Sequence, residues 1–463
     1  MAPRAGQLLD LCKEALVAAG EAEVEIYAEL RTRGVARFAE SVLGQHMELV
    51  DPIAVVRVAR GARVAEASTS RLDSGALIEA IRQAARLARV VPETDGFPGF
   101  TGEEPPGEAP PRLAPQTAAC DAERRVDLLA GVFDRARAAE LVAAGVLETA
   151  AIAAVCATTR GCERAHDATA ASFEMWASAG ANGARGYGGH AHRDVDALRI
   201  HEETERAIRI ASMSRDPVAL DPGAYDVVFE PPAVAEIVER FGAIAFPASA
   251  IADGTSPLAG RIGESVTRES ITIADDPLDP SELGFGAPFD REGTWRRRVP
   301  LIERGIARGA LYDRAHAARA GTRSTGSAAP LPRAGAIAPA SLAMDGGDAA
   351  GVEELIAGVE RGLYVCRMHH VDGLLDPRRA VVSGQTRDGL FLVENGRIAR
   401  AAVPMRFECR VLDALARCDG MTRARAAIPV RRGRGATIVP AIRVRALRFD
   451  GLGRAALGEE AVR

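Results

Sequence analysis

Near the start of the chain the hydrophobic pattern changes its period twice, and this change constrains the fold more than any other feature. Residues 6–19 carry apolar side chains at helical spacing, whereas residues 55–58 (VVRV) and 63–65 (RVA) belong to segments of period two. Gly61 lies between those two apolar runs, as in a β-hairpin. Residues 73–90 return to helical spacing. The pattern therefore predicts a helix, a strand meander and a second helix.

The remaining pattern predicts an α+β chain of two domains. A connector rich in Pro, Gly and Glu occupies residues 92–115. A hinge rich in Pro and Asp, at residues 216–217 and 221–223, marks the domain boundary. Strand patterns and turns dominate the second half, where Asn395-Gly396 between apolar runs is a strong hairpin signal. We therefore expect an N-terminal α+β domain over residues 1–219, which includes the connector, and a β-rich C-terminal domain over residues 220–463.

Three further segments are assigned from weaker patterns. Residues 121–144 are expected to form a helix. Residues 180–189 hold five glycines and are expected to form a loop, without the GxGxxG spacing after a strand that binds a dinucleotide. Residues 319–351 lack hydrophobic periodicity and are rich in Gly, Ala, Ser and Pro, so they predict a long loop.

Composition excludes several classes of function. The formal net charge is −5 and no basic stripe stands out, so binding to nucleic acid through phosphate neutralisation is not expected. Lys13 is the only lysine and lies in a plain helical pattern, which argues against a P-loop or a Schiff-base enzyme. No apolar run approaches the roughly 20 residues that span a bilayer, and no signal-peptide core is visible. We therefore expect a cytoplasmic protein without a membrane partner.

Several strings of the sequence resemble the TldD/PmbA family, whose members are also called modulators of DNA gyrase. Each string alone is weak, but together they follow the order of the family over most of the chain. The strings are residues 55–72, 215–231, 256–264 (SPLAGRIGE), 275–280 (DDPLDP), 362–365 (GLYV) and 384–396 (GQTRDGLFLVENG).

This resemblance implies both a fold and a biochemical role. Family members have an α+β N-terminal domain and a β-rich C-terminal domain. The TldD branch carries HExxxH on a helix after a strand that resembles residues 226–229, and this motif holds zinc together with a later Cys. The TldE (PmbA) branch lacks the motif and pairs with TldD. The pair is a cytosolic heterodimeric peptidase of unfolded peptides, including leader peptides of modified peptide natural products.

The zinc motif of the TldD branch is absent from this sequence. Aligned on the strand and helix, HExxxH falls at residues 239–244, so Glu239 and Ile244 occupy the two histidine positions. No histidine occurs between His201 and His316, so a shift of register cannot restore the motif. The resemblance therefore implies the TldE branch. It implies no cofactor on this chain, zinc in a TldD-like partner, and a heterodimer, with a homodimer possible if no partner exists.

Four other residues could form an atypical metal site. His190 and His192 would place two imidazoles on one face of a strand, with surface exposure as the simpler interpretation. His201 and Glu205 resemble HExxH with the second His replaced, and they would share one helix face. A solvated, charged helix face is the simpler interpretation of that pair.

Two more pairs are candidates for contact with a peptide or a partner. His369 and His370 are neighbours in a strand pattern, so at most one of them is expected to line a site. The resemblance implies a position near the active site of the partner, with a packed or surface histidine as the simpler interpretation. Ser324 and Thr325 belong to a turn that is similar to one in the family, inside the long loop, and could be structural or could face the partner.

Three functions compete at this stage. The first is a non-catalytic subunit that helps a TldD-like metallopeptidase admit peptides, for which addition of a strand to a sheet edge is a physical route. The second is an independent metal-dependent hydrolase with atypical ligands. The third is a stand-alone peptide-binding scaffold. The metal content of the purified protein separates the second from the others.

Overall fold

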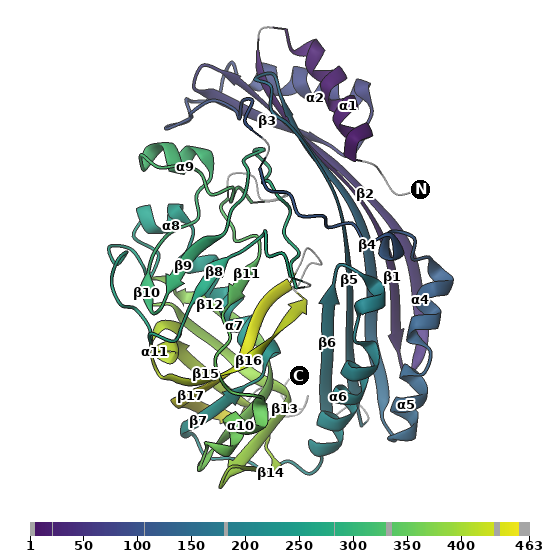
Figure 1. Ribbon diagram of the computed structural model, residues 1–463, viewed down its shortest axis with the longest axis vertical. Coiled ribbons are helices and arrows are strands. Elements are labelled where there is room, and N and C mark those ends of the chain that lie inside the picture. Colours follow the sequence, from purple (N-terminus) through teal and green to yellow (C-terminus); the bar gives the residue numbers. More distant parts are fainter. Residues whose placement is uncertain are drawn as a thin grey trace, which may run out of the picture.

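The structure, a computed structural model, consists of two sheets with helices around them, one sheet from each half of the chain (Figure 1). It describes residues 5–20, 22–105, 107–179, 184–281, 283–329, 336–429 and 436–452. The first sheet lies within residues 23–192 and the second within residues 223–452. The α+β class predicted from the sequence is confirmed, as is the β-rich character of the second half. The domain boundary at residue 219 stays a prediction.

The N-terminal sheet has six strands in the order β3-β2-β1-β4-β5-β6, and all neighbours are antiparallel. The helix, meander and helix predicted for the start of the chain are observed as α1 (Ala5–Leu16), β1 to β3 and α2 (Ser74–Leu87). The strands are β1 (Glu23–Ala39), β2 (Val42–Arg60), β3 (Arg63–Thr69), β4 (Val142–Thr158), β5 (Glu163–Ser178) and β6 (Arg185–His192).

Helices cover one face of this sheet. α1 and α2 pack on one end, and α4 (Ala122–Leu129), α5 (Val132–Ala138) and α6 (Ile200–Met213) pack on the other (Figure 1). Strand side chains alternate between faces, so the residues under the helices are apolar at every second position. The opposite face meets the C-terminal half of the chain through a small apolar cluster of Tyr27, Val55, Cys156, Cys162 and Phe289.

Two of the segments assigned from weaker patterns are corrected here. The single helix expected at residues 121–144 is two short helices, because Gly131 adopts φ +81 between them, and β4 already begins at Val142. The glycine-rich run at residues 180–189 is not a loop throughout. Its first part, residues 180–183, lies outside the described residues, and β6 begins at Arg185.

Glycine is required in β6 because α6 packs directly on the strand backbone. A Cβ atom at Gly188 would lie 2.0 Å from the carbonyl oxygen of Glu203, and one at Gly186 would lie 2.1 Å from that of Ala207. The glycine-rich segment that suggested a loop therefore includes a strand on which a helix packs directly.

The C-terminal sheet is larger and partly closed. β7 pairs with both β12 and β17, so β7, β12, β13, β15 and β17 close into a ring. The long loop expected at residues 319–351 is irregular in its described part apart from β11 and from Arg319, which ends a short helix. The strands are β7 (Gly223–Phe229), β8 (Ile273–Asp275), β9 (Val299–Glu303), β10 (Ile306–Ala307), β11 (Leu342–Met344), β12 (Arg361–Asp376), β13 (Val381–Glu394), β14 (Arg397–Ala401), β15 (Met405–Arg410), β16 (Cys418–Pro429) and β17 (Ala436–Leu452).

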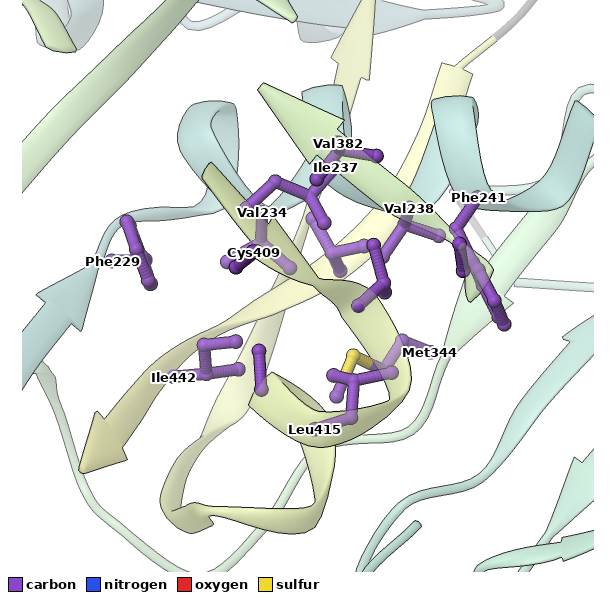
Figure 2. Close-up of a cluster of buried hydrophobic side chains, with 14 of the residues drawn as sticks. Phe229, Val234, Ile237, Val238, Phe241, Met344, Val382, Cys409, Leu415 and Ile442 are labelled. Atoms are coloured by element: carbon purple, nitrogen blue, oxygen red, sulfur yellow. The ribbon is translucent and has the colours of Figure 1, made fainter. Parts of the chain in front are cut away.

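Helix α7 (Pro231–Ala245) fills the core of this half. Pro231 and Pro232 occupy the first helical positions, where their fixed φ suits a helix start and no backbone donor is lost. Four apolar side chains follow at helical spacing and point into a cluster shared with the surrounding strands (Figure 2). They are Val234, Ile237, Val238 and Phe241. Among the described residues, no helix combines the length and apolar character needed to cross a bilayer.

Candidate functional site

The position of the missing zinc motif lies at the junction of the two sheets. A small cavity separates α7 from β5 and β6, and Glu239 lines it. We call this cavity the interface pocket. Its volume is about 30 Å³, a size for water rather than for a substrate. The lining residues are Glu174, Tyr187, Pro232, Ala235, Glu236, Glu239, Arg367, Ile428 and Pro429.

α7 can lie at this junction because one of its faces is apolar and another carries acidic side chains. One face is buried in the C-terminal core, and Glu236 and Glu239 on another face are half-buried at the pocket. Ile244, at the second motif position, is not at the pocket and packs against the core cluster instead. The two motif positions therefore have different surroundings, and one of them is apolar.

A buried ionic and aromatic group forms the wall opposite α7. Arg367 on β12 donates to Asp388 Oδ2 at 2.7 Å, and Trp176 Nε1 on β5 donates to the same oxygen at 3.2 Å. The Arg367 guanidinium also lies 4.5 Å from the ring centroid of Tyr187 on β6. Burial alone would lower the pKa of Arg367, but the Asp388 carboxylate beside it raises the pKa overall. This group ties the two sheets together.

Tyr187 and the acidic residues complete the electrostatics of the pocket. The Tyr187 hydroxyl donates to Glu174 Oε1 at 2.9 Å. Burial, followed by the nearby Glu174 carboxylate, raises the pKa of the Tyr187 phenol. Tyr187 therefore stays protonated and acts as a hydrogen-bond donor rather than as a base. The pocket is lined by polar groups that bond to one another and is too small for a catalytic cleft.

Zinc does not fit these residues. A catalytic zinc site needs three protein ligands of the His, Cys, Asp or Glu type converging on one point. Ile244 has no ligand atom, and among the described residues no group of three such side chains is close enough to hold a metal ion. We therefore derive no catalytic step through a metal on this chain.

His190 and His192 lie side by side on β6, as the strand spacing predicts. Their ring centroids are 6.4 Å apart and the rings are nearly parallel. Both side chains are only 7 % exposed, so the simpler interpretation of surface histidines is wrong. His192 Nδ1 accepts from the Asp194 amide at 2.9 Å, which leaves Nε2 for any other contact. The pair offers two imidazoles, but no described third ligand joins them.

His201 and Glu205 are exposed on α6, away from that pair. Glu205 forms an ion pair with Arg135 of α5, with 3.0 Å between Oε1 and Nε. This arrangement is the solvated, charged helix face that was the simpler interpretation. The structure does not bring these two residues together with His190 and His192 into a metal group.

His369 and His370 contradict the expectation that neighbours point to opposite faces of the strand. His370 has φ +51, and the pairing of β12 with β13 shifts between His369 and Asp372. The two rings consequently meet, with centroids 3.9 Å apart. His370 is exposed and His369 half-buried. His369 lies two residues after Arg367 in regular register, so it shares the strand face of the interface pocket.

Ser324 and Thr325 use their hydroxyl groups within the chain. The Ser324 hydroxyl donates to the Tyr312 carbonyl at 3.0 Å, and the Thr325 hydroxyl accepts from the Tyr312 amide at 2.7 Å. These bonds hold the loop against the irregular segment that contains Tyr312. The structural role is therefore plain, while contact with a partner stays a prediction.

Sequence reasoning missed most residues of the interface pocket. Arg367 and Tyr187 line the pocket, and Asp388 joins Arg367 to Trp176. Of these four residues, Asp388 alone lies in a string that resembles the family, residues 384–396. Their proximity depends on how two separate sheets meet. Aromatic content was a further signal, because Trp and Tyr are rare in this chain. Trp176 and Tyr187 lie opposite each other on the adjacent strands β5 and β6.

The buried His190 and the half-buried His166 make stability dependent on pH. Burial, followed by nearby positive charge, lowers the pKa of His166 and of His190 to about 4. In the unfolded chain the imidazole pKa is about 6.5. Between pH ~4 and pH ~6.5 the unfolded state therefore binds a proton that the folded state does not bind. Stability should therefore fall as pH drops from about 6.5 to about 4, by about 2 kcal/mol per histidine between pH ~7 and ~5.

The measurement is urea unfolding of the wild type and of His166→Gln at both pH values. The variant should lose about 2 kcal/mol less than the wild type on acidification. His201→Gln is the matched control, because His201 is exposed and should leave the pH dependence unchanged. Equal acid sensitivity of wild type and His166→Gln would contradict the assignment of His166.

Comparison with known proteins gives the same fold and one family. A model described as the PmbA/TldA metallopeptidase C-terminal domain matches residues 222–451, about half of the chain. The solved structure of TldE from Thermococcus kodakarensis superimposes with a TM-score of 0.84 at 20% identity, covering 96% of this chain and 99% of that one. A protein described as a modulator of a DNA gyrase from Thermotoga maritima gives 0.82 at 19% identity, with the same coverage. At such identities these matches show the fold alone.

Curated relatives match part of the chain. A metalloprotease of Methanothermobacter thermautotrophicus is 26% identical over 226 residues, which are 47% of this chain and 46% of the relative. A metalloprotease of Archaeoglobus fulgidus is 30% identical over 139 residues, which are 29% of this chain and 32% of the relative. The aligned part thus spans about half or less of the length of these relatives.

Proposed function

The chain belongs to the PmbA/TldD family, and from this premise we propose that it is a non-catalytic, TldE-like subunit of a zinc metallopeptidase complex. The complex would act on unfolded or precursor peptides. In this proposal the chain binds no zinc itself, forms a heterodimer with a TldD-like subunit that carries HExxxH, and works in the cytoplasm. Its seven cysteines are all free thiols, which supports a reducing compartment.

One observation carries the proposal. At the two histidine positions of the family motif this chain has Glu239, which lines a pocket of about 30 Å³, and Ile244, which packs against the core. Restoring a zinc ligand at residue 244 would put an imidazole where the structure has an apolar contact. In this proposal α7, the helix that would carry the zinc ligands, instead packs between the two sheets.

The physical contribution of such a subunit is to shape and close a chamber. An obligate partner interface is expected to bury a large area, on the order of 2,000 Å² or more. A peptide could be held by strand addition, which reads backbone groups more than side chains. His369, on the strand face of the interface pocket and beside the exposed His370, is the residue we propose for peptide contact.

Co-expression with the HExxxH-bearing family member of the same host tests the proposal. We expect a complex of one copy of each chain by size-exclusion chromatography, with one zinc per complex. Replacing the first motif histidine of the partner should remove the zinc and the peptidase activity without separating the chains. Zinc that persists after this replacement would contradict the assignment.

The same experiment separates the competing functions. Stoichiometric zinc on this chain alone would favour an independent hydrolase and direct attention to His190 and His192, which are the two imidazoles that lie together. A metal-free chain that does not associate with the partner but binds peptide would favour a stand-alone scaffold. Either result would overturn the subunit proposal.

A further inference from the structure

A second concave surface lies in the C-terminal half, away from the interface pocket. It has a volume of about 360 Å³, which is in the range of pockets that hold ligands. Residues that precede and begin β9, residues around β10, and the loop after α9 (Arg314–Arg319) form its walls. We call it the arginine groove and define it by Arg297, Arg298, Arg308, Arg323, Ile262 and Tyr312.

Positive charge in this groove is only partly balanced. Arg298 pairs with Asp276 at 3.2 Å and Arg308 with Glu303 at 3.1 Å. Arg297 instead donates to the Ser324 carbonyl at 2.7 Å, which leaves its charge uncompensated. Within the described residues no carboxylate pairs with Arg297 or with Arg323. The groove therefore carries excess positive charge on a chain whose net charge is −5.

Another groove of the same half shows that arginine content alone does not produce such an excess. That groove has a volume of about 290 Å³ and is also lined by several arginines. There, Arg379 pairs with Asp376, Arg410 with Asp413 and Arg448 with Asp450, while Arg417 donates to the backbone carbonyls of Asp413 and Ala446. Two carboxylates, Glu408 and Asp413, also line that groove, whereas the described lining of the arginine groove includes none.

The walls of the arginine groove are held in place by hydrogen bonds. Ser324 and Thr325 are both bonded to the backbone of Tyr312, and the Arg297 guanidinium bonds back to Ser324. Arg296 Nε also donates to the Gly326 carbonyl at 2.9 Å, on the same loop. A groove held in this way loses little conformational entropy when a ligand binds.

Apolar surface accompanies the charge. Ile262 is 46% exposed, which is unusual for a large aliphatic side chain, and it lines the groove together with the half-buried Tyr312. A ligand that matches this surface must offer carboxylates for the guanidinium groups and an apolar side chain for Ile262. Guanidinium groups suit carboxylates because they donate two parallel hydrogen bonds.

We propose that the arginine groove binds an acidic peptide segment that also carries apolar side chains. Carboxylates of the segment pair with Arg297 and Arg323, and an apolar side chain covers Ile262. The site lies entirely on this chain, so it goes beyond the subunit proposal and is testable without a partner. Its failure and the failure of the subunit proposal are therefore distinguishable.

The test is fluorescence anisotropy of the full chain with a labelled synthetic peptide of Glu, Asp, Leu and Gly. We expect saturable binding that weakens with added salt. The same peptide with Gln and Asn in place of the acids should bind at least about tenfold more weakly. The double variant Arg297→Gln/Arg323→Gln should also lose about tenfold in affinity. Arg297→Lys/Arg323→Lys should recover part of that loss.

The matched control is Arg379→Gln/Arg448→Gln in the other groove, which should bind the peptide as the wild type does. All four arginines are exposed, so thermal unfolding of the variants should match the wild type and exclude loss of fold. Equal affinity for the acidic and the amide peptide, unchanged binding by the Gln double variant, or no saturable binding to the wild type would each overturn the proposal.

Discussion

Arg57→Met should destabilise the protein by about 3 to 5 kcal/mol, because two buried carboxylates lose the cation that forms ion pairs with them. Arg57 on β2 donates to Glu25 on β1 at 2.7 Å and to Glu292 of the C-terminal half at 3.0 Å. The three side chains are 13%, 3% and 7% exposed, so water does not screen them. Equilibrium unfolding in urea measures the loss.

The pKa values predict how this loss depends on pH. Burial raises the pKa of Glu25, while Arg57 holds the pKa of Glu292 below its ordinary value despite burial. Without Arg57 both carboxyls take up protons more readily, although the nearby Arg291 still attracts their negative charge. The variant should therefore lose more stability near pH ~8 than near pH ~5.

Two further variants show whether charge is the cause. Arg57→Met/Glu25→Gln/Glu292→Gln removes the whole ionic group and should recover much of the stability, since neutral side chains tolerate burial better. Arg71→Met is the control, because Arg71 pairs with Asp73 on the surface, and it should cost less than about 1 kcal/mol. A cost below about 1 kcal/mol for Arg57→Met would refute a structural role of the group.

This ionic group also illustrates what the sequence could not predict. Glu25 and Arg57 lie on strands that the hydrophobic pattern indicated correctly, but Glu292 is 235 residues away from Arg57 in the chain. Period and turn signals depend on neighbours in sequence. They predict a strand and which of its faces is buried, but not which distant loop covers it. For the same reason no period or turn signal predicted that Arg367 and Trp176 would meet at Asp388.

The candidate site was predicted mainly from the histidines that the sequence lacks. The lack of histidine between His201 and His316 is visible in the sequence alone, and the structure adds that the partly buried Ile244 packs against the core. For His369 and His370 the alternation rule did not apply, because the positive φ of His370 turns its ring toward that of its neighbour. Side-chain direction in a strand is predictable only where the register is regular.

The glycine-rich run shows that one composition can support opposite structures. A loop and a strand under a closely packed helix both need residues without a Cβ atom, so the glycines of residues 184–189 did not distinguish them. Only the position of α6 does so, because the backbone of this helix lies against Gly186 and Gly188. The difference is open to a direct test.

Gly188→Ala should destabilise the protein by about 3 kcal/mol, a large effect for one methyl group. The new Cβ would lie 2.0 Å from the carbonyl oxygen of Glu203 and 2.8 Å from its carbonyl carbon. Both are backbone atoms of α6, so no side-chain rotation relieves the contact and the helix itself must move. Equilibrium unfolding measures the loss, and a loop at this position would instead tolerate the substitution.

Displacement of α6 should also reach α7. Arg206 of α6 donates to the Tyr187 carbonyl at 2.7 Å and forms an ion pair with Glu230, the residue that precedes α7. Gly188→Ala should therefore weaken association with the proposed partner as well as stability. Gly223→Ala is the matched control on a strand, because its Cβ would meet only the Tyr225 ring at 3.8 Å. If both variants are as stable as the wild type, α6 does not press on β6 and the glycines there have another cause.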